Sequence, residues 1–224
     1  RGKDYLVVTG GTITVTSTGD GLKSDNDTDA KLGYVAIEGG TVTITAGGDG
    51  VSAFTDAVVA DGTLTIKAGG GHTGKVAADA SAKALKSGSN TVVSGGTVAI
   101  DSADDALHSD STVTIDGGSL TVATGDDAVH AEADFTLAGG TLNVTSSYEG
   151  LESAKIHITG GSATVTTSDD GINGTSGAAQ SGGGMNSVQT GVEVDMSGGT
   201  VVLDTGGDGL DSNGIATITG GTMI

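Results

Sequence analysis

Apolar and polar residues alternate along most of the chain in short segments that flank Gly-Gly pairs. Ile13 and Val15, or Leu142 and Val144, are separated by a single polar residue, which in most such segments is threonine. Alternation with period two and β-branched residues is typical of strands with one buried face. The pattern therefore predicts many short strands and an all-β protein.

The alternating segments recur with a fixed step of about 22 residues. The step is marked by a Gly-Gly pair followed by Thr or Ser, at Gly10-Gly11, Gly39-Gly40, Gly95-Gly96, Gly117-Gly118, Gly139-Gly140, Gly160-Gly161, Gly198-Gly199 and Gly220-Gly221. Asp61-Gly62 fills the gap after Gly40, and three longer steps indicate insertions. A repeat this short cannot bury its own apolar face, so neighbouring repeats must stack.

A short acidic turn followed by an aliphatic residue keeps the same step, as in Asp104-Asp105-Ala106-Leu107. The aliphatic residue adds a fifth inward row to the four rows of the strands: Leu22, Val51, Leu85, Leu107, Val129, Leu151, Ile172 and Leu210. Five inward residues in each of about nine repeats predict five aliphatic ladders. We therefore expect a right-handed parallel β-helix of about nine coils, with three strands per coil.

We expect residues 1–224 to form one domain with three loop insertions. The insertions lie near Asp25–Gly33, at Gly69–Asn90 and at Gly174–Thr190. Within the second, the segment Val76–Lys86 (VAADASAKALK) predicts a short helix. The chain stops inside a repeat at Ile224, so we expect truncation within a coil, with a cap or further coils beyond it.

Composition removes several classes of protein. The chain has 42 Gly but no Pro, which excludes collagen, and no Cys, which excludes disulfides, thiol catalysis and Cys-based zinc sites. No apolar run approaches the roughly 18 residues of a membrane span. Acidic residues outnumber basic ones 28 to 9, and the net charge of -19 argues against nucleic acid as a partner.

Stacking would turn the acidic turns into a column of carboxylates with a backbone spacing of about 4.8 Å. Carboxylates that close repel one another, and a divalent cation would relieve the repulsion. Calcium suits such turns because it takes six to eight oxygen ligands. The candidate calcium ligands are Asp104, Asp105, Asp126, Asp127, Glu149, Asp169, Asp170, Asp208 and Asp211. The simpler alternative is that Asp and Gly are good turn residues.

A polar row beside this column is a candidate surface for carbohydrate. Its candidate contacts are His108, His130, Tyr148, Glu152 and Asn173. Imidazoles can bond sugar hydroxyls, and Tyr148 can stack on a sugar ring, although solvated turn side chains explain the same residues. Outward threonine rows would also allow ice binding, but Asn143 and Lys67 interrupt them.

The motifs G-G-T-x-x-[IV] and D-D-[AG]-[LVI], clearest between Gly95 and Asn173, resemble a family of secreted bacterial carbohydrate-binding β-helices. The family is polysaccharide-lyase-like and binds cellulose and acidic sugars such as polygalacturonate, with calcium. The resemblance implies calcium at the acidic turns and a secreted or cell-surface, extracellular location. Lys83 and Lys86 depart from the acidic pattern, and so does Tyr148.

Three functions remain open. The first is a non-catalytic, calcium-dependent protein that binds uronate or plant cell-wall polysaccharide. The second is a calcium-dependent, pectate-type lyase, in which the metal acidifies the proton beside the uronate carboxylate and Lys86 or Lys83 removes it. The third is an extracellular structural or adhesive solenoid. The scarcity of aromatic residues, 2% of the chain, favours acidic sugars over flat neutral glycan faces.

Overall fold

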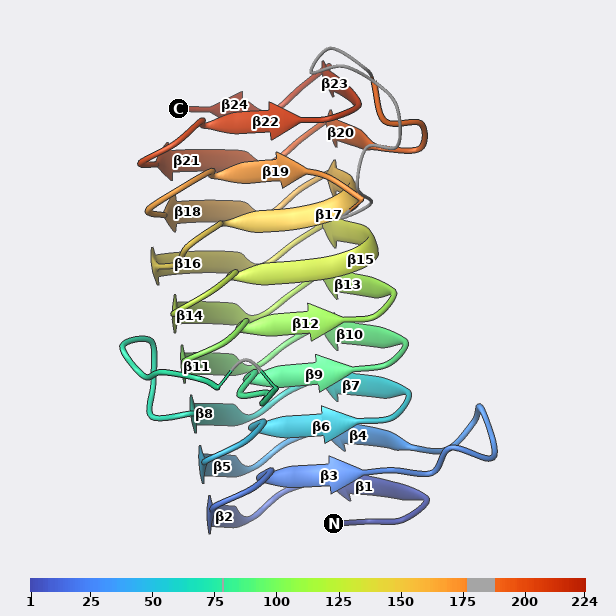
Figure 1. Ribbon diagram of the computed structural model, residues 1–224. Helices are drawn as coiled ribbons and strands as arrows, with labels where there is room; N and C mark the ends of the chain where they lie inside the picture. The colour runs from blue at the N-terminus through green and yellow to red at the C-terminus, as the bar shows by residue number, and fades with distance from the viewer. Residues whose placement is uncertain (78, 177–187) are drawn as a thin grey trace.

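The computed structural model describes residues 1–77, 79–176 and 188–224. These residues form strands β1 to β24, arranged as a stack of coils with a 15-stranded and a nine-stranded sheet, and they contain no helix (Figure 1). Each pairing between strands is parallel, and each strand pairs with its counterpart in the next coil. The predicted all-β parallel solenoid is therefore confirmed.

Each coil contains three strand positions. The first holds β1 (Tyr5–Val8), β4 (Tyr34–Ile37), β7 (Asp56–Val59), β10 (Asn90–Val93), β13 (Thr112–Ile115), β20 (Glu193–Met196) and β23 (Ile215–Ile218). The second holds β2 (Thr12–Ser17), β5 (Thr41–Ala46), β8 (Thr63–Ala68), β11 (Thr97–Ser102), β14 (Ser119–Thr124), β16 (Thr141–Ser146), β18 (Ser162–Thr166), β21 (Thr200–Asp204) and β24 (Thr222–Met223). The third holds β3 (Leu22–Ser24), β6 (Val51–Ala53), β9 (Leu85–Ser87), β12 (Leu107–Ser109), β19 (Ile172–Gly174) and β22 (Leu210–Ser212). The longer strands β15 (Val129–Leu137) and β17 (Leu151–Ile158) each join a third position to the next first position.

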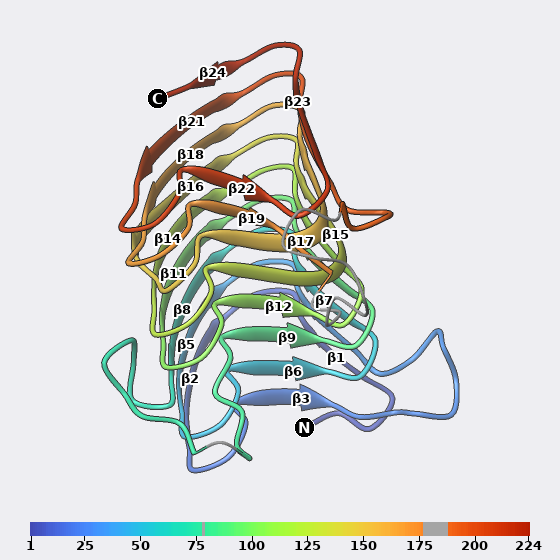
Figure 2. The same ribbon diagram turned by 45° about the horizontal axis from the view of Figure 1, so that its top comes forward.

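The winding is right-handed. In Figure 1 the front strands β3, β6 and β9 run left to right, the strands behind them return right to left, and the chain climbs from N to C. The nine strands of the second position give the expected nine coils. Figure 2 shows the same coils stacked in register.

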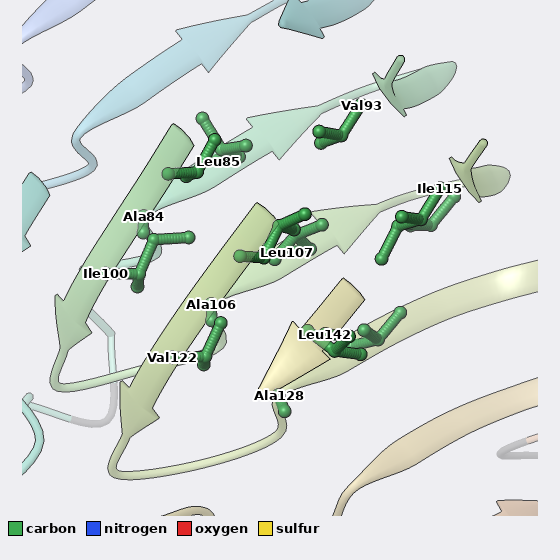
Figure 3. Close-up of a cluster of buried hydrophobic side chains, with 14 of the residues drawn as sticks. Ala84, Leu85, Val93, Ile100, Ala106, Leu107, Ile115, Val122, Ala128 and Leu142 are labelled. Carbon is green, nitrogen blue, oxygen red and sulfur yellow. The ribbon is translucent and has the colours of Figure 1, made fainter. Parts of the chain in front are cut away.

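The core consists of aliphatic ladders that run along the stack. Leu107 lies between Leu85 of the preceding coil and Val129 of the following one, and all three side chains are buried. Figure 3 shows Leu85 and Leu107 of this ladder beside the alanine ladder of Ala84, Ala106 and Ala128. Because each coil contributes the same small or branched side chains, the core needs few aromatic residues.

The Gly-Gly corners are required by backbone geometry and by close stacking. The second glycine of the pair has a positive φ, 78° at Gly96 and 70° at Gly140. A Cβ on Gly140 would also lie 2.6 Å from the backbone carbonyl of Gly117 in the preceding coil. Gly62, which the repeat predicted at this corner, has the same conformation with a φ of 97°.

The predicted helix over Val76–Lys86 is wrong. Leu85 and Lys86 lie in β9, which pairs with β6 and β12, and the other described residues of the segment are turns or irregular. Burying Leu85 in its inward row stabilises the coil more than the helix propensity of Ala and Lys would stabilise a helix there. Residues 177–187 of the third insertion lie outside the described part. No helix that could span a membrane is found among the described residues.

Candidate functional site

The acidic turns form two aligned rows at the edge where each second strand leads into a third, on the left of Figure 1. The acid row is Asp20, Asp49, Lys83, Asp105, Asp127, Glu149, Asp170 and Asp208. The outer row lies three residues later, at Lys23, Ser52, Lys86, His108, His130, Glu152, Asn173 and Asp211, and strand pairing aligns its members from coil to coil.

One carboxylate oxygen of the acid row bonds the backbone of the next coil. The Asp20 Oδ1 accepts the backbone N–H of Asp49 at 3.1 Å, and the Asp170 Oδ1 accepts that of Asp208 at 2.7 Å. The 38-residue step before Asp208 therefore leaves these two turns adjacent. This bond explains why aspartate suits the turn without any metal, and it leaves the second oxygen for another partner.

In the first half of the column, from Asp20 to Asp105, the second oxygen meets a lysine. The Nζ of Lys23 lies 2.7 Å from Asp20 Oδ2, and the Nζ of Lys83 lies 2.7 Å from Asp104 Oδ1 and 2.6 Å from Asp105 Oδ2. Burial would lower the pKa of Lys83, but the charge of Asp105 and bonds to Asp104 and Asp105 raise it. Lys83 is therefore a resident cation for the acids of the following coil.

In the middle coils the partner is histidine. The Nδ1 atoms of His108 and His130 lie 2.9 Å from Asp105 Oδ2 and 3.0 Å from Asp127 Oδ2, and the two rings stack with centroids 5.1 Å apart. Burial would lower the pKa of His130, but its bond to Asp127 and the charges of Asp105 and Glu152 raise it to about 9. Both predicted sugar-contacting histidines therefore bond the acid row directly.

Burial would raise the pKa of Asp105 as well, but the histidine and lysine around it outweigh that effect. The bond from His108, together with the charge and bond of Lys83, lowers its pKa to about 2. This carboxylate stays ionised at any physiological pH. The aspartates of the acid row from Asp20 to Asp105 therefore each have a lysine partner.

In the C-terminal coils, within the described residues, no lysine or arginine pairs with Glu149, Glu152, Asp170, Asp208 or Asp211. Burial, a bond to Glu149 and the charge of Asp127 raise the pKa of Glu152 to about 8. Asn173 Nδ2 donates to Glu149 Oε2 at 2.7 Å and to Glu152 Oε2 at 3.0 Å, which holds the two carboxyls side by side. Within the described residues these carboxylates have no lysine or arginine partner, and His130, whose Nδ1 lies 3.4 Å from Glu152 Oε1, is the nearest cationic side chain.

Asp126 shows the same excess of negative charge. Burial and the charges of Asp127 and Asp105 raise its pKa to about 6. Its carboxylate lies with those of Asp104 and Asp105 in one group whose ligand atoms are within 4.8 Å of one another. Lys83 already lies on two members of that group, so three of the four predicted ligands of these coils are together but partly neutralised, whereas Asp127 groups with His130 and Glu152.

Tyr148 stands beside this part of the column. Its ring is 49% exposed and borders two cavities of about 510 Å³ and 380 Å³, the first of which also contains Asp104 and Asp126. A bond to Asp169 and the charge of that carboxylate raise the pKa of the Tyr148 hydroxyl. An exposed ring next to several carboxylates suits contact with a sugar.

Sequence reasoning missed a cavity of about 530 Å³ on the N-terminal coils, lined in part by Lys23, Lys86 and Phe54. Phe54 is 51% exposed at the corner between β6 and β7. The first insertion forms one wall, which Asn26 holds by accepting the backbone N–H groups of Thr28 and Asp29. A phenylalanine on a turn next to an insertion was the signal that would have found it.

Comparison with known proteins gives one match. A family model described as "Carbohydrate-binding domain-containing protein" matches residues 1–128 and 129–224. No curated protein and no solved structure matches the chain.

Proposed function

The chain belongs to the family of carbohydrate-binding domain-containing proteins, and we propose that it binds acidic, uronate-rich polysaccharide through calcium without cleaving it. The observation that supports the calcium step is the contrast within one column: the N-terminal acids have lysine partners, whereas those from Glu149 to Asp211 have none within the described residues. Carboxylates that are held close together without a lysine partner repel one another, and binding a cation from solution would relieve that repulsion.

Calcium fits the C-terminal coils better than the centre of the column. The candidate ligands there are Glu149, Asp169, Asp170, Asp208 and Asp211, which offer only oxygen atoms; no three of them lie within 4.8 Å of one another in the described structure, so their side chains would close around the ion. Asp104 and Asp105 fit less well, since the ammonium of Lys83 already lies on both. Bound calcium would supply the positive charge that links protein carboxylates to uronate carboxylates.

The charge of the protein makes the metal a condition of binding. A net charge of -19 repels a polyuronate, so the chain needs cations at its acidic surface to bind one. Calcium at millimolar levels is found outside cells, which agrees with a secreted or cell-surface protein. Tyr148 would pack against a sugar ring there, whereas the amide group of Asn173 is already engaged by Glu149 and Glu152.

The lysine environment favours binding over lyase chemistry. A lyase base must be unprotonated, yet the pKa of Lys83 is raised by Asp105 and Asp104. Lys86 Nζ lies 3.6 Å from Asp49 Oδ2 and 3.3 Å from Ser81 Oγ, on coils whose acids are neutralised. Neither lysine faces the carboxylates that would hold calcium.

Calorimetry with oligogalacturonate tests the proposal. We expect binding in millimolar calcium, at least tenfold weaker binding in chelator, and a similar loss in Asp170→Asn with Asp208→Asn. Asp116→Asn, at an acid outside both rows, is the matched control. Equal affinity in chelator would reject the calcium step. A rise in ultraviolet absorbance from unsaturated uronides, lost in Lys86→Ala, would instead establish the lyase.

A further inference from the structure

A histidine and two carboxylates from adjacent coils converge on one point of the column. Asp127 Oδ2 and Glu152 Oε1 lie 3.0 Å and 3.4 Å from the same atom, His130 Nδ1. All three ligand atoms are within 4.8 Å of one another. In a zinc site with bonds near 2.1 Å, ligand atoms are roughly 3.4 Å apart, so these side chains need little movement to surround an ion.

A second layer of contacts holds this tripod. Asn173 Nδ2 donates to Glu152 Oε2 at 3.0 Å, which fixes the oxygen that faces away from His130. On the other side of the ring, Glu132 Oε1 lies 3.5 Å from His130 Nε2. A carboxylate on the distal nitrogen orients a metal-bound histidine and increases its basicity.

A small cavity borders two of the three ligands, His130 and Glu152. It has a volume of about 60 Å³ and is lined by His130, Glu132 and Glu152, among others. This space accommodates a few water molecules. An ion held by three protein ligands would therefore have room to complete its coordination with water, as open zinc sites do.

The donor set selects the class of ion. Calcium prefers oxygen ligands alone, whereas imidazole with carboxylates suits zinc and neighbouring transition ions. The neighbouring group of Asp105, His108 and His130 is less suitable, because Lys83 Nζ lies 2.6 Å from Asp105 Oδ2. We propose that Asp127, His130 and Glu152 form a binding site for a divalent transition ion of the zinc class, separate from the oxygen-only calcium ligands of the C-terminal coils.

Calorimetric titration of the metal-free full chain with Zn²⁺ tests the site. We expect one zinc ion per chain, a Co²⁺ derivative with visible absorption bands, and no displacement by a hundredfold excess of calcium. His130→Ala should weaken zinc binding at least a hundredfold, and Glu152→Gln at least tenfold. The matched control is His72→Ala, which removes a histidine whose Nδ1 lies 2.7 Å from Asp101 Oδ1 and which belongs to no group of three ligands among the described residues.

Absence of zinc binding in the wild-type chain would overturn the site. So would binding that survives His130→Ala, or displacement by equimolar calcium. If His130→Ala melts at a lower temperature, His130→Gln provides a second test, because it keeps a hydrogen-bonding side chain but removes the imidazole. The readout needs neither glycan nor calcium, so failure here leaves the calcium-dependent glycan binding standing.

Discussion

The two ends of the turn column have the same backbone arrangement but a different balance of charge, because lysines neutralise the acids at only one end. At the N-terminal end, Lys23 pairs with Asp20, and Lys83 lies on Asp104 and Asp105. At the C-terminal end, Asp170 bonds the backbone of the next coil in the same way as Asp20, but no lysine or arginine of the described chain pairs with it. An aspartate on such a turn is therefore a structural residue first, and the group on its second oxygen decides whether it has the potential to bind metal.

Removing the resident cation should make the N-terminal end resemble the C-terminal one. Lys83→Met leaves Asp104 and Asp105 close together without an ammonium, and breaking a buried pair this way costs about 3–5 kcal/mol. We expect that loss in urea denaturation with chelator present, and partial recovery in calcium. Lys155→Met is the control, because its exposed pair with Glu193 at 3.2 Å should be worth about 0–1 kcal/mol. A loss below 1 kcal/mol for Lys83→Met would contradict its role.

The acid-rich end should make the metal-free protein less stable as pH rises. The pKa of Glu152 is raised to about 8, so its ionisation above pH 4.5 is disfavoured in the folded state. The pKa of His130 is raised to about 9, so its contribution is complete below pH 6.5 and disappears as pH rises through 9. Both ionisations lower the stability of the folded state as pH rises. We expect the free energy of unfolding to fall by about 1–3 kcal/mol between pH 5 and 9.

Thermal melting in chelator across that pH range measures the loss. Glu152→Gln should flatten the profile, since it removes one of the two titrating groups without removing the side chain. Melting temperatures that rise from pH 5 to pH 9 would show that these acids are not destabilising.

A lysine placed at the C-terminal end should make it resemble the N-terminal one. Glu149 holds the same row position as Lys83, so in Glu149→Lys the ammonium would face Asp169 and Asp170 of the next coil. We expect about 1 kcal/mol more stability in chelator and at least tenfold weaker calcium binding by calorimetry. Glu149→Gln separates loss of one acid from gain of a cation. Unchanged calcium affinity in Glu149→Lys would exclude this end as the calcium site.

Two exposed rings allow the glycan surface to be assigned to one end. Phe54 and Tyr148 are 51% and 49% exposed, so replacing either by alanine should change stability by less than about 0.5 kcal/mol. We expect Tyr148→Ala to weaken calcium-dependent oligogalacturonate binding about fivefold and Phe54→Ala to leave it within twofold. The reverse result would move the acidic glycan to the N-terminal cavity.

Much of the fold could be predicted from the sequence because each coil of a solenoid repeats the same pattern of inward apolar residues and corner glycines. Leu85 kept its inward position in a coil that had lost its acids, and Gly62 kept its corner without a preceding glycine. The helix over Val76–Lys86 failed because local propensity was read without the stacking neighbours of β9.

The site was less predictable because its contacts depend on side-chain reach between coils. Lys83 was identified as a lost acid, whereas it supplies the cation for Asp104 and Asp105. The sequence predicts sugar contacts for His108 and His130, which stay a prediction, but it did not predict that their Nδ1 atoms bond the acid row. No repeat pattern states which way a ring nitrogen points or how far an ammonium extends.

Hydrogen–deuterium exchange with and without calcium tests the contrast between the two ends most directly. The backbone amides of Asp208 and Gly171 lie in the C-terminal turns, and those of Asp49 and Gly21 lie in the N-terminal ones. We expect millimolar calcium to slow exchange at least tenfold at Asp208 and Gly171 and to leave Asp49 and Gly21 unchanged. Equal slowing at both ends, or slowing at the N-terminal turns alone, would contradict the assignment of calcium to the coils whose turn acids have no lysine partner within the described residues.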